Sequence, residues 1–367
     1  MKILYCTPYD LSFGSGIARS SRYLYEYYLN KDSKEHSLTL LPMNRNSHIS
    51  ENMNKIKRLY CGINDYRIII DKIKKEISEN KYDIVHLLSS ASISILKDYY
   101  LVKFLKKKKI PSIVHFRFGR IPELSKKENW EWKLIIKVAE LATRIIVIDK
   151  ESYDTLCNIG LTNIEYLPNP LSPKVEKFVE ENSFSRKENE ILFVGHVYKT
   201  KGIFELVKAC SSISGIKLKV VGLYTEDIKN DLTKLAEVRD EGKWIEFTGN
   251  LTAEKVLENM LTCSVFVLPT YTEGFPNVIL ESMICACPII TTDVGAIPEM
   301  LDIYNNPNMY GICVKPKQIE NLKKSIEEML TNKEFALSCG QNAKRRVKEL
   351  YSISIIWEQM CRIWDNI

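Results

Sequence analysis

The chain has 367 residues, of which 45% are apolar and 27% charged, so it reads as a globular protein too long for one compact core. No stretch approaches the roughly 18 apolar residues that span a bilayer, and the apolar run at the N-terminus is too short for a signal peptide. The ten cysteines form no CxxC pair and the five dispersed histidines show no metal-ligand spacing. We therefore expect reduced, mostly buried thiols in a cytoplasmic protein, with no metal site and no cofactor.

The net charge of +6 is divided unequally between the two halves of the chain. Residues 1–150 carry a net charge of +12, and residues 151–367 carry −6. This imbalance favours contact between the first half and an anionic surface, such as lipid headgroups or a lipid-diphosphate acceptor. Nucleic acid is disfavoured because no recognition motif is present. A solvated helix face explains any single lysine of the basic set, which comprises 103–109, Lys126, Lys127, Lys133 and Lys137.

In the first half, short apolar strands alternate with helical segments. This alternation is typical of an α/β protein with parallel sheets. The predicted strands are Lys2–Cys6, Ile84–Leu87, Ser112–Phe116 and Arg144–Ile148, and the predicted helices are Ala18–Leu29, Asp65–Glu79, Ile93–Lys107 and Trp130–Leu141.

Residues 167–173 hold three prolines in seven positions, so we place a domain linker there. The charged stretch 177–190 is expected to separate this linker from the next strand. A final amphipathic helix over 353–364 carries Trp357, Met360 and Trp364 on one face. The predicted strands of the second half are Ile191–Val194, Lys217–Val221, Trp244–Phe247, Val265–Leu268 and Pro288–Thr291, and the helix that follows the first of these is predicted over Gly202–Cys210.

Two glutamates eight residues apart, Glu273 and Glu281, are the most informative pair in the sequence. Pro276 suits the first position of a helix, because its missing N–H costs nothing there, and Pro288 ends that helix. With Pro276 as the first helical residue, Glu281 lies about 7 to 8 Å along the axis. The helix start can hold an anion between the two carboxylates. The ordinary alternative is an exposed turn followed by a glutamate that complements the helix dipole.

Residues 271–283 resemble the two-glutamate motif of the family 4 retaining glycosyltransferases, which belong to the glycosyl transferases group 1. The resemblance implies the GT-B architecture, in which two Rossmann-like doubly wound parallel-sheet domains face each other across a cleft. It places an acceptor-side domain at 1–170 and a nucleotide-sugar-binding domain at 171–351, and it implies that the terminal helix, within 352–367, packs back on the first domain.

The same resemblance assigns roles to the residues around the two glutamates. Glu273 would orient the sugar and favour a cationic transition state, and Glu281 would accept hydrogen bonds from the ribose. Tight turns at the ends of other strands would hold the base. The donor-binding set in this second half comprises His196, Lys201, Gly222, Gly249, Leu251, Gly274, Phe275, Pro276, Asn277, Val278 and Glu281.

The loop after residue 194 resembles the diphosphate-binding loop of the family. Lys201 matches the lysine that stabilises the leaving group, whereas His196 stands where many members carry arginine. A histidine is half protonated only near pH 6.5, so His196 is expected to act as a hydrogen-bond donor and Lys201 to supply the fixed charge. A surface lysine and a loop histidine are the ordinary alternative.

Two motifs of the first half complete the predicted site. Gly14 and Gly16 resemble the family's Gly-rich first loop, whose backbone approaches the donor diphosphate. His115 and Arg117 flank the position of the family's cleft histidine, and both point to the same face of a strand. Either residue could reach the sugar, and a satisfied core histidine is an equal alternative for His115.

The resemblance implies transfer of a sugar from a nucleoside diphosphate, most often UDP, to a hydroxyl acceptor with retention of configuration. The catalytic residues would be Glu273, His115, Arg117 and Lys201, with protein cations in place of a metal. A glycan or lipid-linked oligosaccharide of a bacterial capsule or O-antigen is the expected acceptor, and the inner face of the cytoplasmic membrane the expected location. A sugar-nucleotide epimerase or hydrolase, and a non-catalytic nucleotide- or glycan-binding subunit, are the alternatives.

Overall fold

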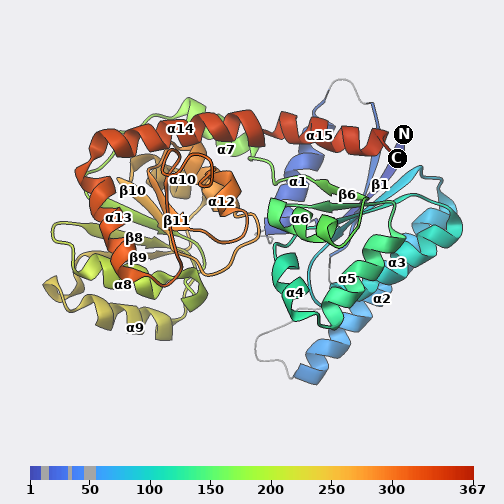
Figure 1. Ribbon diagram of the computed structural model, residues 1–367, viewed down its shortest axis with the longest axis horizontal. Coiled ribbons are helices and arrows are strands. Elements are labelled where there is room, and N and C mark those ends of the chain that lie inside the picture. Colours follow the sequence, from blue (N-terminus) through green and yellow to red (C-terminus); the bar gives the residue numbers. More distant parts are fainter. Residues whose placement is uncertain (10–15, 32–34, 45–54) are drawn as a thin grey trace. The chain divides into compact units, whose positions relative to one another are not determined.

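The computed structural model describes residues 1–9, 16–31, 35–44 and 55–367, which fold into two compact units (Figure 1). The first unit joins Met1–Pro170 with the C-terminal segment Ile353–Ile367, and the second comprises Leu171–Ser352. The chain therefore passes between the units twice, at 170/171 and at 352/353. Among the described residues, no helix is long and apolar enough to cross a membrane.

The first unit is built on a parallel sheet with strand order β2-β1-β3-β4-β5-β6 in the described part of the chain. Helices lie on both faces of this sheet (Figure 1). The strands are β1 (Lys2–Thr7), β2 (Ser37–Pro42), β3 (Ile84–Ser89), β4 (Ser112–Phe116), β5 (Arg144–Val147) and β6 (Ile164–Tyr166). The helices are α1 (Gly16–Leu29), α2 (Lys55–Glu79), α3 (Ser94–Lys108), α4 (Ile121–Lys127), α5 (Trp130–Leu141), α6 (Lys150–Asn158) and α15 (Ile353–Asp365).

Alternate side chains of the first sheet enter two separate cores, which is why its strands read as nearly continuous apolar runs. Leu4, Val85 and Val114 join the core formed with helices such as α3 and α5. Their neighbours Ile84 and Ile113 join the core on the opposite face, with α1 and α15. Trp357, Met360 and Trp364 are buried in this second core, so the predicted apolar face of the terminal helix covers the first sheet.

The second unit repeats the plan with strand order β12-β11-β10-β7-β8-β9 in its parallel sheet. The strands are β7 (Glu190–Val194), β8 (Lys217–Val221), β9 (Ile245–Gly249), β10 (Val265–Leu268), β11 (Ile289–Thr292) and β12 (Ile312–Val314). The helices are α7 (Pro173–Glu181), α8 (Ile203–Ser211), α9 (Glu226–Ala236), α10 (Ala253–Thr262), α11 (Asn277–Ile284), α12 (Ile297–Met300), α13 (Ile319–Thr331) and α14 (Lys333–Tyr351), with 3₁₀ turns η1 (Lys199–Lys201) and η2 (Asp240–Gly242).

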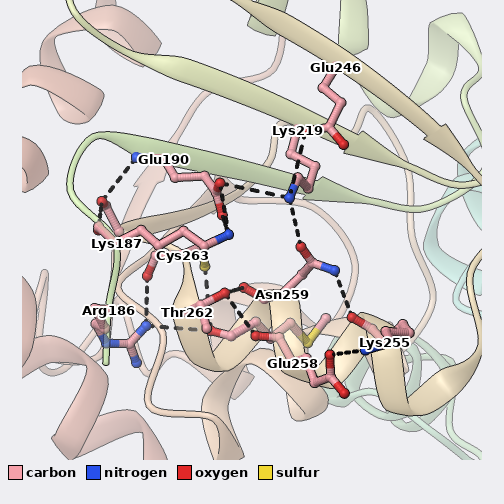
Figure 2. Close-up of polar contacts among 12 residues, drawn as sticks. Arg186, Lys187, Glu190, Lys219, Glu246, Lys255, Glu258, Asn259, Thr262 and Cys263 are labelled. Atoms are coloured by element: carbon pink, nitrogen blue, oxygen red, sulfur yellow. Dashed lines mark hydrogen bonds and ion pairs between the residues drawn. The ribbon is translucent and has the colours of Figure 1, made fainter. Parts of the chain in front are cut away.

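Arg186, just before β7, fastens the ends of two helices of the second unit. Its guanidinium donates to the main-chain oxygens of Cys263 (2.8 Å), after α10, and of Cys285 (2.9 Å) and Ala286 (2.6 Å), after α11. The last carbonyls of a helix have no intrahelical partner, so this one side chain satisfies groups that would otherwise be left unpaired. Figure 2 shows Arg186 beside the end of α10, below the strand that begins at Glu190.

The structure corrects several of the expected element limits. The stretch 177–190, expected to be a charged connection, is helical up to Glu181 in α7, which begins with Pro173 at its first position. Strands β2 and β6 were not anticipated, and α2 begins ten residues before the predicted start at Asp65. Pro276 is the residue that precedes α11 in extended conformation, so the helix starts at Asn277 and not at Pro276 as predicted.

Three glycines allow the main chain to approach itself closely where strands of the second sheet end. A Cβ atom on Gly202 would lie 1.9 Å from the Pro269 oxygen, and one on Gly222 would lie 1.9 Å from the Gly195 oxygen. A Cβ atom on Gly295 would lie 2.3 Å from the Glu273 oxygen. These distances exclude any side chain, so glycine is required for the loops to meet.

We expect Gly202→Ala to lower the thermal midpoint of the protein more than Gly215→Ala does. The two glycines have nearly the same φ, +70° and +71°, so both substitutions carry the cost of a left-handed residue, roughly 1–2 kcal/mol. Gly215 has no atom within 4 Å of the added Cβ, whereas Gly202 faces the Pro269 oxygen. Thermal unfolding of both variants measures the difference. Equal losses for the two variants would show that the close approach does not matter to stability.

Candidate functional site

The predicted donor-binding residues of the second unit fall after the carboxyl ends of neighbouring strands. His196 and Lys201 follow β7, Gly222 follows β8, and the turn with Glu273 follows β10. Strands of one parallel sheet end at the same edge, and ligands of open α/β folds bind there. The order β10-β7-β8 makes these three loops neighbours.

Lys201 and Glu273 form an ion pair at this edge. The Nζ atom of Lys201 lies 2.5 Å from Oε1 of Glu273, with the side chains 26% and 13% exposed. The main chain supports the pairing, because the Tyr271 nitrogen donates to the Thr200 oxygen over 2.8 Å. The predicted leaving-group lysine and the predicted sugar-binding glutamate are thus brought together from loops that are distant in sequence.

The turn that carries Glu273 is fixed from two sides. The Ala296 nitrogen donates to the Gly274 oxygen over 2.9 Å, and Phe275 is buried with its ring 5.5 Å from that of Tyr351. Helix α11 then starts at Asn277, and the half-buried Glu281 lies one turn further into the helix. The other donor-site residues of this segment, Pro276 and Val278, lie at and just inside the helix start.

His196 is exposed, and its ring stacks on that of Tyr198 with centroids 5.7 Å apart and planes at 2°. Both rings therefore lie at the surface of the loop after β7. The turn residues of the neighbouring strands lie close by: the Gly222 nitrogen donates to the Gly249 oxygen over 2.9 Å, and half-buried Leu251 follows two residues later. All the donor-site residues predicted for the second unit therefore belong to one sheet edge.

In the first unit, His115 and Arg117 share a face at the end of β4, as the strand period predicts. Nη1 of Arg117 lies 3.3 Å from Nε2 of His115, and its Nη2 donates to the Ser20 hydroxyl in α1. Both residues are buried, with His115 at 0% and Arg117 at 6% exposure. Gly16 is the first residue of α1, and Gly14 lies outside the described residues.

Sequence reasoning missed His86, the third member of this buried polar group. Its ring lies 5.6 Å from that of His115, and its Nδ1 accepts a hydrogen bond from the indole nitrogen of Trp364 over 3.1 Å. Side chains alternate between the two faces along β3 and β4, and this period would have placed both histidines on one face. The contact of His86 with Trp364 could not be predicted in this way, because Trp364 lies on the last helix of the chain.

Burial and the Arg117 charge keep both histidines neutral. Burial lowers the pKa of His86 to about 3 and lowers the pKa of His115 well below its usual value, and Arg117 acts in the same direction in each case. Burial also lowers the pKa of Arg117, to about 10, so this guanidinium stays charged at neutral pH. In the part of the chain that the structure describes, no carboxylate pairs with it. Arg117 is therefore the cation of this group.

Similarity to solved structures establishes the fold. The Anabaena protein HepE in complex with UDP matches over 100% of both chains, with a TM-score of 0.73 and 14% identity. The two parallel α/β units are those of the GT-B architecture.

Relatives with curated names are also similar in sequence. The capsular polysaccharide biosynthesis glycosyltransferase CapM of Staphylococcus aureus is 27% identical over 252 residues, which are 63% of this chain and 61% of CapM. The N,N'-diacetylbacillosaminyl-diphospho-undecaprenol alpha-1,3-N-acetylgalactosaminyltransferase of Campylobacter jejuni is 22% identical over 257 residues, 70% of this chain and 65% of that enzyme. The chain thus spans less than two thirds of the length of either relative.

The family model described as glycosyl transferases group 1 matches residues 174–346. This segment includes the ion pair of Lys201 with Glu273, the helix α11 and all the strand-end loops described above for the second unit. By its sequence, the second unit of this chain matches the glycosyl transferases group 1 family.

Proposed function

We propose that this protein is a retaining glycosyltransferase of family 4, which transfers a sugar from a nucleoside diphosphate to a hydroxyl of a glycan or lipid-linked acceptor. The observation that carries the proposal is the Lys201–Glu273 ion pair beside the start of α11, inside the segment that matches the family model. The name of CapM supports a role in capsular polysaccharide biosynthesis, and the name of the Campylobacter enzyme supports a lipid-linked acceptor. The UDP complex of HepE favours a UDP-sugar as donor.

In the proposed reaction, the bond between the sugar C1 atom and the diphosphate oxygen breaks, and a bond from C1 to the acceptor oxygen forms. The departing phosphate takes the proton of the acceptor hydroxyl. Negative charge builds on the diphosphate, and Lys201, His196 and the start of α11 would stabilise it in a site that excludes water. Protein cations would fill the role that a metal has in other transferases.

The ion pair suggests separate roles for Lys201 and Glu273 when a donor binds. Before a donor binds, each side chain neutralises the other in a half-buried position where an isolated charge would be costly. A diphosphate would compete for Lys201, since it offers more negative charge than one carboxylate. Glu273 would then be free to accept hydrogen bonds from the sugar hydroxyls and to favour a cationic transition state. Glu281, further along α11, would bind the ribose.

The first unit would contribute Arg117 rather than His115 as its charged group. His115 is neutral and fully buried, whereas Arg117 is charged at neutral pH and lies just beyond the end of β4. A guanidinium suits an anionic part of donor or acceptor, because its N–H groups form a planar fork. His115 would hold this guanidinium through its Nε2 atom.

We expect UDP-sugars to raise the thermal midpoint of the protein, because a ligand that binds only the folded state stabilises it by about 2.7 kcal/mol at one hundred times its Kd. Lys201→Met should reduce this shift, and Glu273→Gln should lower the rate of sugar transfer about 100-fold or more, as loss of one transition-state contact does. Thermal-shift screening with a panel of nucleotide-sugars and transfer from a labelled donor measure the two effects.

Lys199→Met and Glu226→Gln are the matched controls for that experiment. Lys199 belongs to the same 3₁₀ turn as Lys201 but is exposed, and the side chain of Glu226 on α9 is 75% exposed. Both controls should keep the shift and the rate. Unchanged transfer by Glu273→Gln would contradict the mechanism and favour a binding role. Release of free sugar or of an epimer as the sole product would favour the hydrolase or epimerase alternative.

We also propose that the first unit rests on the inner face of the cytoplasmic membrane through helices α3 and α5. Lysines of the basic set on α3 and α5, such as Lys106 and Lys133, are exposed. The aromatic rings of Tyr100 on α3 and Trp130 on α5 are also exposed, at 60% and 54%. Lysines attract anionic headgroups, and exposed aromatic rings suit the interface between headgroups and water.

Binding to vesicles should rise with their content of anionic lipid and fall with salt. Each lysine near an anionic surface contributes about 1 kcal/mol, so replacing Lys106, Lys107 and Lys133 together by Gln should weaken binding roughly 100-fold at low salt. Co-sedimentation with vesicles of stated composition measures this. A triple replacement at Lys229, Lys234 and Lys255 in the second unit is the control. Indifference to anionic lipid at low salt would remove the membrane proposal.

A further inference from the structure

A histidine, a cysteine and a glutamate from the two ends of the chain meet in the first unit. One ligand atom each of Glu35, His36 and Cys361 can be chosen so that all three atoms lie within 4.8 Å of one another. Glu35 and His36 directly precede β2, and Cys361 lies on α15. Among the described residues, this is the one group of such side chains that is close enough to hold a metal ion.

The imidazole of His36 is buried, and its ring nitrogens make no hydrogen bond to any described residue, which also indicates a ligand at this place. His36 is 5% exposed, and neither of its ring nitrogens has a hydrogen-bond partner in the described part of the chain. Nε2 has only the longer ion-pair contact with Asp365 (3.4 Å), and a buried ring nitrogen without a hydrogen bond is costly. The ring is nonetheless held in place, because it meets the indole of Trp364 edge to face with centroids 5.5 Å apart.

Asp365 is positioned to support the histidine as a metal ligand. Its Oδ1 atom lies 3.4 Å from Nε2 of His36, one turn of α15 beyond Cys361. Histidines that bind a metal with one ring nitrogen usually donate the other N–H to a carboxylate, which fixes the tautomer. Asp365 would take this role and leave Nδ1 of His36 for the ion.

The mixture of donors selects the type of metal. A thiolate, an imidazole and a carboxylate are ligands that Zn²⁺ accepts together in tetrahedral sites, whereas Mg²⁺ and Ca²⁺ prefer oxygen alone. Zinc–nitrogen and zinc–sulfur distances of about 2.0 and 2.3 Å put ligand atoms roughly 3.5 Å apart. The three atoms must therefore draw together by about 1 Å, and the exposed side chain of Glu35 has the freedom to do so.

We propose that Glu35, His36 and Cys361 bind one Zn²⁺ ion, with Asp365 holding His36, and that the ion fastens α15 to the start of β2. Zinc would displace the Cys361 thiol proton into solvent as the Zn–S bond forms. The site lies outside the proposed transfer chemistry, and with three protein ligands a water molecule would complete the tetrahedron.

No local sequence pattern indicates this site, because the spacing of its residues is not that of a metal motif. Glu35 and His36 are adjacent, but Cys361 belongs to the last helix of the chain. The cluster exists only because α15 returns to the first sheet and packs beside α1 and the edge of β2.

The test uses the full chain, freed of metal by a chelator and then given Zn²⁺ or Co²⁺ alone. We expect one Zn²⁺ per chain in competition with a chromophoric chelator, and a rise of roughly 5 °C in thermal midpoint at saturating zinc. With Co²⁺ we expect a thiolate-to-cobalt charge-transfer band together with the visible bands of a tetrahedral site. Absence of the charge-transfer band in the wild-type protein overturns the proposal.

Substitution of the proposed ligands tests whether they cause the charge-transfer band and bind the zinc ion. Cys361→Ser should abolish the charge-transfer band and weaken zinc binding about tenfold or more, and His36→Gln should weaken zinc binding to a similar degree. Cys157→Ser, at a half-buried cysteine on α6, should leave both unchanged. A band that survives Cys361→Ser overturns the proposal. Should a variant fail to fold, the wild-type cobalt spectrum still decides. None of these measurements requires a nucleotide-sugar, so they stand apart from the proposed transferase activity.

Discussion

Contact of main chain with main chain at the edge of the second sheet is the constraint on which the candidate donor site depends. Gly202 follows the turn that carries Lys201, and its backbone touches Pro269, just ahead of the turn that carries Glu273. Gly295 brings a third loop against the Glu273 backbone. Side chains can adjust their rotamers, but backbone contacts without a Cβ atom leave little freedom. The ion pair of Lys201 with Glu273 therefore rests on fixed loops, as preorganised electrostatic stabilisation requires.

The two units differ in how much of their candidate site the sequence could indicate. In the second unit, the strand ends, the two glutamates and Lys201 were predicted from local patterns, because a parallel sheet aligns the loops that follow its strands. The pairing of Lys201 with Glu273 was not predicted, since it depends on the order of strands β7 and β10 in the sheet. Helix α7 was missed because its many charges concealed the buried Val175 and Val179.

In the first unit, the sequence predicted the direction in which the side chains of β4 point, but not whether they are buried. The strand period placed His115 and Arg117 on one face, as found. The strand sequence could not predict that this face is buried, because the helix that packs on it, α15, comes from the other end of the chain. The same helix supplies Trp364 to His86 and Cys361 to the proposed zinc site. Contacts of this kind lie beyond any local pattern in the sequence.

The terminal helix also bears on how the main chain connects the two units. The main chain crosses between the units at 170/171 and again at 352/353, and the Leu171 nitrogen donates to the Tyr351 oxygen over 2.7 Å. The two crossings therefore lie side by side, so a change in the arrangement of the units must turn both at once. Ser352 interrupts α14 and α15 with one extended residue, φ −60° and ψ 149°, which makes it a suitable place for such a change. A zinc ion that fastened α15 to the first sheet would hold that helix in place, so bending at this crossing would fall on Ser352 rather than within α15.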